Sequence, residues 1–335
     1  MLMKRMRTDR SRRGTFPKQD DAMLYVYFGH HKCASTWIRE IISQVCNEAG
    51  ISTLFLWNPL TPMRRSSLAC HGYSGIEVND ILNFINERKI QFALFGNSWK
   101  DIVRAVSETK IKGFHVIRDP RDIIVSGYFS HKYSHPTEGM PHLAEHRNRL
   151  QNVSKEEGLL LEMDFSAQEL RDMGEWSYDH PDILEIKMEN LIVRPYDVFI
   201  QIFEFMGLMG WGDDFHPGYR RVINFTKRML NRLSFRHPLL RWLRQPMPVT
   251  GELLLGRVWD HRFEKKARRR KGEEDPRSHY RKGQPGDWRN HFTEEHVAAF
   301  KEKFGDLVVR LGYEPDNDWG LTPREPVAQT PTAPR

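Results

Sequence analysis

The sequence predicts an α/β protein, with a parallel β-sheet flanked by helices. Short apolar runs typical of buried strands alternate with amphipathic segments of helical period from about residue 24 to residue 311. Such alternation indicates a parallel sheet, because parallel neighbours need a crossover that is usually a helix. The 335 residues, 39% of them hydrophobic, are enough to bury a sizeable core.

The expected elements follow one another along the chain. Four segments have the length and apolar content of buried strands: Leu24–Phe28, Gln91–Phe95, Gly113–Ile117 and Ile183–Lys187. A further short apolar run covers Ile51–Leu56. Apolar residues at helical spacing, or helix-opening signals such as Pro120, predict helices over these ranges: Ser35–Ala49, Glu77–Arg88, Asp119–Tyr128, Pro195–Met206 and Glu294–Leu311.

Composition sets the domain organisation and the expected compartment. Residues 1–21 are basic and aperiodic, and residues 316–335 are rich in proline, so both are predicted to be tails around one domain at 22–315. The first residues lack a signal-peptide core and no apolar run is long enough to span a membrane, so a cytoplasmic protein is expected. Three cysteines without paired spacing indicate neither a disulfide framework nor a zinc site.

The segment Phe28–Trp37 has the order of a phosphate-binding loop: strand, small-residue loop, lysine, two hydroxyls and helix. Loop amides at a helix N-terminus face an anion, and Lys32 adds a positive charge. A nucleotide kinase would carry a hydroxyl residue directly after this lysine, to hold Mg²⁺. Here Cys33 and Ala34 follow instead, which argues against an ordinary kinase or ATPase.

Two further basic motifs lie downstream. His115–Tyr128 contains Arg118 directly after an expected strand, and Arg281–Thr293 opens with arginine and lysine. Guanidinium groups form paired hydrogen bonds with phosphate oxygens. The three motifs therefore predict a ligand that carries phosphate at two separate places.

On these motifs the chain resembles the sulfotransferase family that uses 3′-phosphoadenosine-5′-phosphosulfate (PAPS), especially its cytosolic branch. The family reads YPKSGTTW where this chain has Gly29-His-His-Lys-Cys-Ala-Ser-Thr-Trp37. The family motif Arg-x-Pro-x-Asp-x-x-x-Ser corresponds to Arg118–Ser126 of this chain, and the family motif RKGxxGDWKNxFT corresponds to Arg281–Thr293. The resemblance covers roughly residues 23–314. It implies a P-loop nucleoside-triphosphate-hydrolase-like sulfotransferase fold. It also implies sulfuryl transfer from PAPS to a hydroxyl or amine, leaving adenosine 3′,5′-bisphosphate.

The resemblance also implies residue roles. The 5′-phosphosulfate would be held by Lys32, Cys33, Ala34, Ser35 and Thr36. The 3′-phosphate would be held by Arg118, Ser126, Arg281, Lys282 and Gly283. The adenine would lie between Trp37 and Phe263. Ordinary alternatives are a salt bridge of Arg118 with Asp119 or Asp122, and core packing of the two aromatic residues. No metal is expected to be required.

The general base is less clear from the sequence. Cytosolic family members have a catalytic histidine about 22 residues before the motif arginine, where this chain has Gly96. His31 replaces a proline beside the acceptor and has a suitable pKa range for the role. His30, His71 and Glu40 are the alternatives. His131 and His135 have an i, i+4 spacing but no evident third ligand, so a surface or core pair is favoured over a metal site.

The expected acceptor is a small alcohol, phenol, amine or carbohydrate. Its pocket is predicted over Leu56–Gly75 and Ser130–Leu161, with Pro217–Gly256 as a helix pair facing it. Neither a membrane nor a nucleic acid is expected as a partner, and the oligomeric state is open. Two other functions compete with the transferase: a catalytically inert protein that binds PAPS or nucleic acid, which the missing histidine favours, and a P-loop kinase.

Overall fold

The computed structural model describes residues 23–56, 78–98, 100–210 and 219–322. It divides into two compact units. A sheet unit combines residues up to Ile117 with Tyr178–Lys266, and a helical unit combines Arg118–Ser177 with the residues from Ala267 onward. The predicted tail at 1–21 and most of the predicted tail at 316–335 lie outside the described residues.

The sheet unit contains a parallel sheet of five strands in the order β2-β3-β1-β4-β5. The strands are β1 (Leu24–Gly29), β2 (Thr53–Leu56), β3 (Phe92–Phe95), β4 (Ile111–Ile117) and β5 (Ile183–Lys187). The predicted parallel sheet flanked by helices is therefore confirmed. Gly113 lies opposite Val26 in the register, and a Cβ atom there would approach the Val26 carbonyl oxygen to 1.9 Å, so β4 needs glycine at this position.

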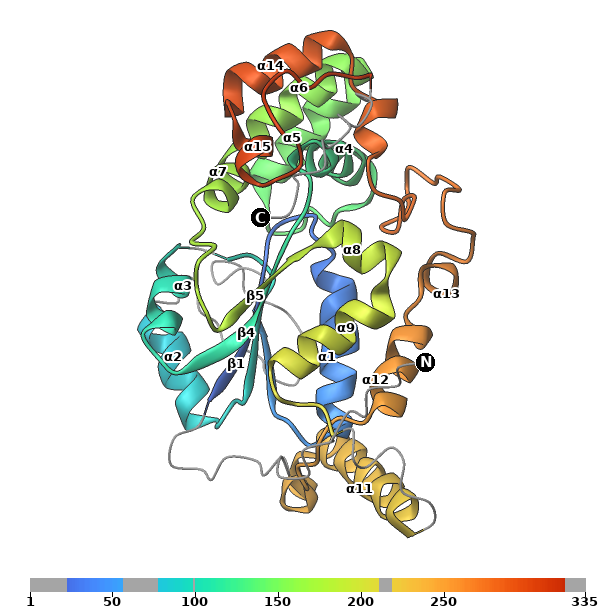
Figure 1. Ribbon diagram of the computed structural model, residues 1–335. Helices are drawn as coiled ribbons and strands as arrows, with labels where there is room; N and C mark the ends of the chain where they lie inside the picture. The colour runs from blue at the N-terminus through green and yellow to red at the C-terminus, as the bar shows by residue number, and fades with distance from the viewer. Residues whose placement is uncertain (1–22, 57–77, 99, 211–218, 323–335) are drawn as a thin grey trace, which may run out of the picture. The chain divides into compact units, whose positions relative to one another are not determined.

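Helices cover both faces of the sheet, as Figure 1 shows. One face carries α1 (Ser35–Glu48), α9 (Pro195–Phe205) and α12 (Gly251–Asp260). The other carries α2 (Val78–Glu87) and α3 (Lys100–Ser107). In α1 the residues Ile38, Ile41, Ile42 and Val45 are fully buried, because their spacing of three and four positions places them on the face that packs against the sheet.

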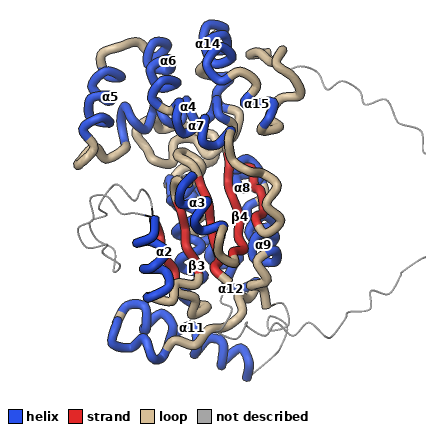
Figure 2. Tube along the Cα trace, turned by 90° about the vertical axis from the view of Figure 1, so that its left-hand side faces the viewer, coloured by secondary structure: helices blue, strands red, loops and turns tan. Residues whose placement is uncertain are grey.

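The helical unit consists mostly of helices, seen together in Figure 2. They are α4 (Pro120–Phe129), the π-helical turn η2 (Ser130–Ser134), α5 (Pro141–Gln151), α6 (Lys155–Phe165), α7 (Ala167–Gly174), the 3₁₀ turn η4 (Asp287–Asn290), α14 (Glu294–Phe304) and α15 (Leu307–Arg310). Trp288, which is fully buried, packs against Phe292 and Trp319. Trp319 was assigned by sequence to the C-terminal tail, yet it is 3% exposed and belongs to this core.

Most predicted elements match the observed ones within two residues. The single helix predicted over Glu294–Leu311 is wrong: it ends at Phe304, and α15 begins at Leu307. Gly305 between them has a φ of +57°, outside the helical region, so the chain turns there. The described part of the predicted stretch Pro217–Gly256 begins at Tyr219. It forms α11 (Tyr219–Arg236), the 3₁₀ turn η3 (Pro238–Leu243) and the start of α12. Among the described residues no helix is long and apolar enough to cross a membrane.

Candidate functional site

The loop between β1 and α1 has the backbone geometry of an anion site. Lys32 and Ala34 both have left-handed backbone conformations, with φ of 63° and 62°. Turns of this kind direct successive N–H groups into one concavity. Ala34 is the N-cap of α1 and supplies no side-chain hydrogen bond, and no acidic residue lies in the first turn. The positive end of α1 is therefore not compensated by this helix's own side chains.

Hydrogen bonds from two serines hold this loop against the end of β3. The Ser98 hydroxyl donates to the Gly29 carbonyl at 2.8 Å, and the Ser35 hydroxyl donates to the Gly96 carbonyl at 3.1 Å. The structure therefore places the segment Gly96–Ser98 beside the loop. This is the segment in which the sulfotransferase family would carry its histidine.

A chain of buried polar side chains, which sequence analysis missed, begins in the same loop. The Nε2 atoms of His30 and His115 are 2.8 Å apart, and His115 Nδ1 lies 2.6 Å from a Glu185 carboxylate oxygen. Because Glu185 accepts from Nδ1–H of His115, the Nε2 atom of His115 is an acceptor and His30 donates to it. Burial lowers the pKa of His115 to about 3, and burial together with His115 lowers the pKa of His30. Both rings are therefore neutral at pH 7.

The two predicted adenine contacts lie on connected segments of the sheet unit. Trp37 donates from Nε1 to the His261 carbonyl at 2.7 Å and packs edge-on against Phe199. His261 lies two residues before Phe263, which opens the short helix α13 (Phe263–Ala267). Glu40, one turn after Trp37 on α1, forms ion pairs with His261 and Lys266. These contacts bring the segment that carries Phe263 to α1.

The Glu40 ion pairs predict a pH dependence of stability. The ion pair with His261, opposed by burial and aided by Lys266, lowers the pKa of Glu40 from 4.5 to about 2. A lowered carboxyl pKa contributes stability above the unfolded value, and this contribution is lost as the pH falls from about 4.5 towards 2. As the pH falls over this interval, the melting temperature of the Glu40→Gln variant should therefore decrease less than that of the wild type. Glu87→Gln, at an exposed position of the same unit, should behave as the wild type.

The left-handed conformation of Ala34 predicts a stabilising substitution. An L-residue pays roughly 1–2 kcal/mol in this region, and glycine does not. Glycine also loses more backbone entropy on folding, which offsets part of this gain. Ala34→Gly should therefore raise the free energy of unfolding by about 0.5–1 kcal/mol. Ala105→Gly, within α3, should lower it by a similar amount. Denaturant unfolding measures both changes, and equal effects of the two variants would contradict the prediction.

In the helical unit, the second motif binds the third through Asp122. Its carboxylate accepts hydrogen bonds from the backbone N–H groups of Gly286 and Trp288, at 2.7 and 2.9 Å. Burial raises the pKa of Asp122 to about 6, although the nearby charge of Arg118 and these two hydrogen bonds act against the increase. Arg118 thus lies within electrostatic reach of Asp122. The other predicted salt-bridge partner, Asp119, caps α4 and accepts two hydrogen bonds from the Arg121 guanidinium.

The third motif is organised around Asp287. This buried carboxylate accepts from Arg281, Lys282 and His291, and these hydrogen bonds, with His291 foremost, hold its pKa well below the usual range although burial opposes ionisation. The Arg281 guanidinium lies 4.7 Å from the centre of the Phe129 ring. Phe129 follows Ser126 by three residues, on the same side of α4. The structure therefore brings Arg281 and Lys282 towards the side of α4 that carries Ser126.

The predicted site residues thus fall into two groups, each assembled within its own unit. The sheet unit holds the group Lys32, Cys33, Ala34, Ser35, Thr36, Trp37 and Phe263. The helical unit holds Arg118, Ser126, Arg281, Lys282 and Gly283. His31 lies in the loop of the first group and is half-buried. His71 lies outside the described residues, as does most of the predicted acceptor stretch Leu56–Gly75.

Comparison with known proteins gives matches in structure alone. No family model and no curated protein matches the sequence. Among solved structures, the chain is similar to mouse sulfotransferase SULT7A1 complexed with PAP, at 13% sequence identity and a TM-score of 0.49, over 86% of this chain and 84% of that one. It is also similar to retinol dehydratase with PAP, in one structure with androsterone and in another with retinol. These two matches have 12% and 13% identity and TM-scores of 0.42, over 86% of this chain and 81% of each of theirs.

Proposed function

We propose that this protein transfers a sulfuryl group from PAPS to the hydroxyl or amine of a small-molecule acceptor. The observation that supports this most directly is the loop before α1, in which left-handed Lys32 and Ala34 open a helix without an acidic cap. Such a loop suits an anionic group, and the absence of a hydroxyl directly after Lys32 disfavours the magnesium-dependent kinase alternative. The proposed reaction requires no metal.

The proposed roles divide between the two groups of residues. Lys32, with the amides of residues 33–36, holds the 5′-phosphosulfate and stabilises the negative charge that develops on the leaving phosphate oxygen. Arg118, Ser126 and the segment 281–283 hold the 3′-phosphate. Trp37 and Phe263 stack on the adenine. Sulfuryl transfer, like phosphoryl transfer, depends mainly on in-line positioning and on charge stabilisation.

Two histidines compete for the role of general base. His31 lies in the loop, and His30 is linked through His115 to Glu185. In that chain the Nδ1 atom of His30 carries the lone pair, and Glu185 would stabilise the charge of a proton taken up there. Glu40 is unsuited, because its carboxylate is engaged in ion pairs with His261 and Lys266.

The pH dependence of kcat/KM distinguishes these two bases. If His31 is the base, His31→Gln removes the acidic limb of the profile and Glu185→Gln leaves it in place. If His30 is the base, Glu185→Gln displaces that limb and His31→Gln does not. A profile that neither variant alters would contradict both assignments.

Thermal unfolding with adenosine 3′,5′-bisphosphate, compared with ATP plus Mg²⁺, AMP and no ligand, tests the proposed function. At 100 times its dissociation constant a ligand stabilises by about 2.7 kcal/mol, which should raise the melting temperature by several degrees. A shift with the bisphosphate alone is expected. A shift only with ATP and Mg²⁺ would indicate a kinase, and no shift with any ligand would contradict the proposal.

An inert binding protein is the second candidate, and the observation that favours it is Gly96 at the position of the family's histidine. Such a protein would bind the bisphosphate without transferring sulfate. Transfer of ³⁵S from labelled PAPS to a panel of phenols, alcohols and amines separates the two functions. Binding without transfer, together with salt-dependent oligonucleotide binding, would favour the inert protein.

A further inference from the structure

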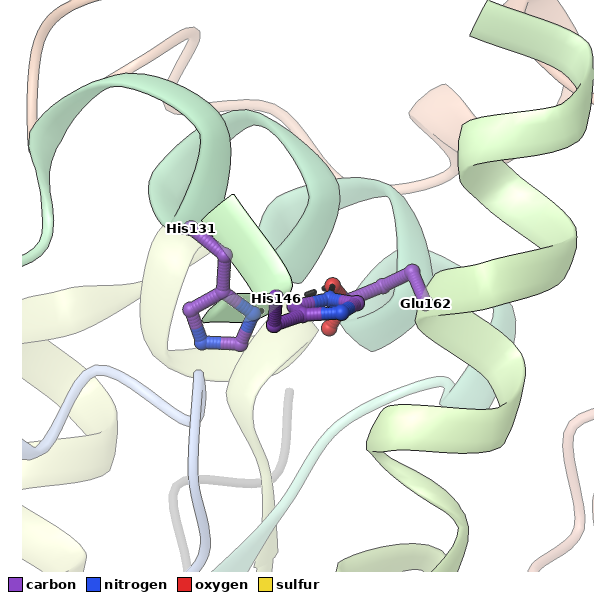
Figure 3. Close-up of side chains that lie close together, drawn as sticks. All are labelled: His131, His146 and Glu162. Carbon is purple, nitrogen blue, oxygen red and sulfur yellow. Dashed lines mark hydrogen bonds and ion pairs between the residues drawn. The ribbon is translucent and has the colours of Figure 1, made fainter. Parts of the chain in front are cut away.

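Three buried side chains of the helical unit, none of them assigned above to the nucleotide, converge on one point. Glu162 Oε2 lies 3.0 Å from His131 Nδ1 and 2.9 Å from His146 Nε2. Figure 3 shows the two rings and the carboxylate facing one another. These ligand atoms all lie within 4.8 Å of one another. They come from three elements, η2, α5 and α6, so only the folded unit assembles them.

We propose that His131, His146 and Glu162 bind a divalent first-row transition metal ion such as Zn²⁺. Two imidazoles and a carboxylate are a ligand set that these ions favour. Zinc bonds to nitrogen and oxygen of about 2.0–2.2 Å place tetrahedral ligands roughly 3.3–3.6 Å apart. The two nitrogen–oxygen distances, 3.0 and 2.9 Å, therefore need to increase by less than about 0.7 Å. Sequence analysis considered His131 with His135 instead, and no signal in the sequence joined His131 to Glu162.

Burial supplies the second argument. His131, His146 and Glu162 are 2%, 4% and 0% exposed. A carboxylate removed from water is costly unless a positive charge compensates it. Arg147, on the same helix as His146, directs its guanidinium to the carbonyls of His131 and His135 rather than to Glu162.

A second carboxylate lies within electrostatic reach of the cluster. The Oε2 atom of Glu169 is buried and has no hydrogen-bond partner among the described residues. Glu169 adds a second buried acid near Glu162 and His131, which a divalent cation would compensate. Glu169 is not among the three residues whose ligand atoms lie within 4.8 Å of one another, so it would contribute charge and not a ligand.

The surroundings hold the three ligands in position. The Ser166 hydroxyl donates to the other oxygen of Glu162, at 2.7 Å, which is the outer-shell contact that orients carboxylate ligands. The Phe165 ring stacks on His146, with ring centres 3.9 Å apart, and meets His131 edge-on. A Cβ atom at Gly127 would come within 2.3 Å of Glu162, so α4 approaches the cluster through a glycine. The bound ion would thus join η2, α5 and α6 next to α4.

Metal titration of the full chain, first stripped with a chelator, tests the proposal. Co²⁺ should bind at one equivalent with the visible absorption of a low-symmetry four-coordinate site, Zn²⁺ should displace it, and Zn²⁺ should raise the melting temperature by several degrees. Glu162→Gln and His146→Gln should weaken binding more than 100-fold. Ser166→Ala should weaken it about 10- to 100-fold, as outer-shell changes do.

Two histidine variants are matched controls. His142→Gln changes an exposed histidine one turn before His146 on the same helix. His291→Gln removes a member of the other group that could hold an ion, Glu274, Asp287 and His291. Both should bind Co²⁺ as the wild type does. Circular dichroism of the metal-free variants separates lost binding from lost folding.

Three outcomes would overturn the proposal. The first is the absence of a stoichiometric Co²⁺ spectrum in the folded wild-type protein, which would leave the cluster a hydrogen-bonded triad. The second is binding that the folded Glu162→Gln variant retains. The third applies if Glu162→Gln does not fold: unchanged affinity in Ser166→Ala and in a folded His146→Gln variant would place the metal elsewhere.

Discussion

Replacing Lys32 with alanine is expected to lower kcat for sulfuryl transfer by about 10²–10³-fold, the usual cost of removing one preorganised group that stabilises transition-state charge. The affinity for adenosine 3′,5′-bisphosphate should fall much less, because the other contacts proposed for this ligand remain. The left-handed backbone at this position, with φ of 63°, is retained by alanine, so the loop should keep its conformation. Single-turnover rates with saturating PAPS measure the effect.

Lys89→Ala is the matched control for this experiment. Lys89 lies in the same unit, is exposed and also has a positive φ, of 50°. Its replacement should leave turnover and bisphosphate binding unchanged. A Lys32→Ala variant with near wild-type turnover would contradict the role assigned to Lys32, and an equal loss in both variants would point to general electrostatics rather than to the loop.

The second large effect is expected in stability, from Arg121→Ala. Arg121 is 1% exposed, pairs with Asp119 and with Glu314 at 2.6 Å, and its guanidinium lies 4.0 and 4.6 Å from the ring centres of Trp288 and Trp319. Alanine would leave two carboxylates without this cation and remove its contact with both rings. Breaking a buried ion pair from one side costs about 3–5 kcal/mol, and we expect a loss of that size.

Urea unfolding followed by tryptophan fluorescence suits this test, because two of the tryptophans contact the mutated side chain. Arg121→Lys should lose less than alanine, since an ammonium keeps the charge but cannot form the paired bond with Asp119. Arg171→Ala, on the exposed side of α7, should change stability by less than about 0.5 kcal/mol. A loss below about 1 kcal/mol for Arg121→Ala would show that solvent or a rearranged core compensates the two acids.

Arg121 also shows where sequence reasoning ends. Within the second motif it stands at a variable position between Pro120 and Asp122, and nothing local distinguishes it from an exposed arginine. Its partner Glu314 lies 193 residues away. Asp122 likewise binds Gly286 across 164 residues, so the connection between the second and third motifs follows from the fold alone.

Three features that sequence analysis did not find have the same origin. The chain His30–His115–Glu185 joins residues from a loop and two neighbouring strands. The cluster His131–His146–Glu162 joins three helical elements that the hydrophobic period did not single out. The break at Gly305 was missed because apolar residues continue at helical spacing on both sides of it. Each depends on the tertiary structure, because it joins residues that are distant in sequence or follows from one backbone angle.

The parallel sheet, its strands and the position of the loop between β1 and α1 could be predicted from the sequence. These features are local, because the burial period of a strand or helix and the turn of five residues between β1 and α1 each depend on consecutive positions. The packing of the elements sets which carboxylates pair with which cations, which histidines are hydrogen-bonded to each other and which side of α4 Arg281 contacts. Such pairings depend on how elements pack, and packing brings together side chains whose spacing along the chain has no period to read.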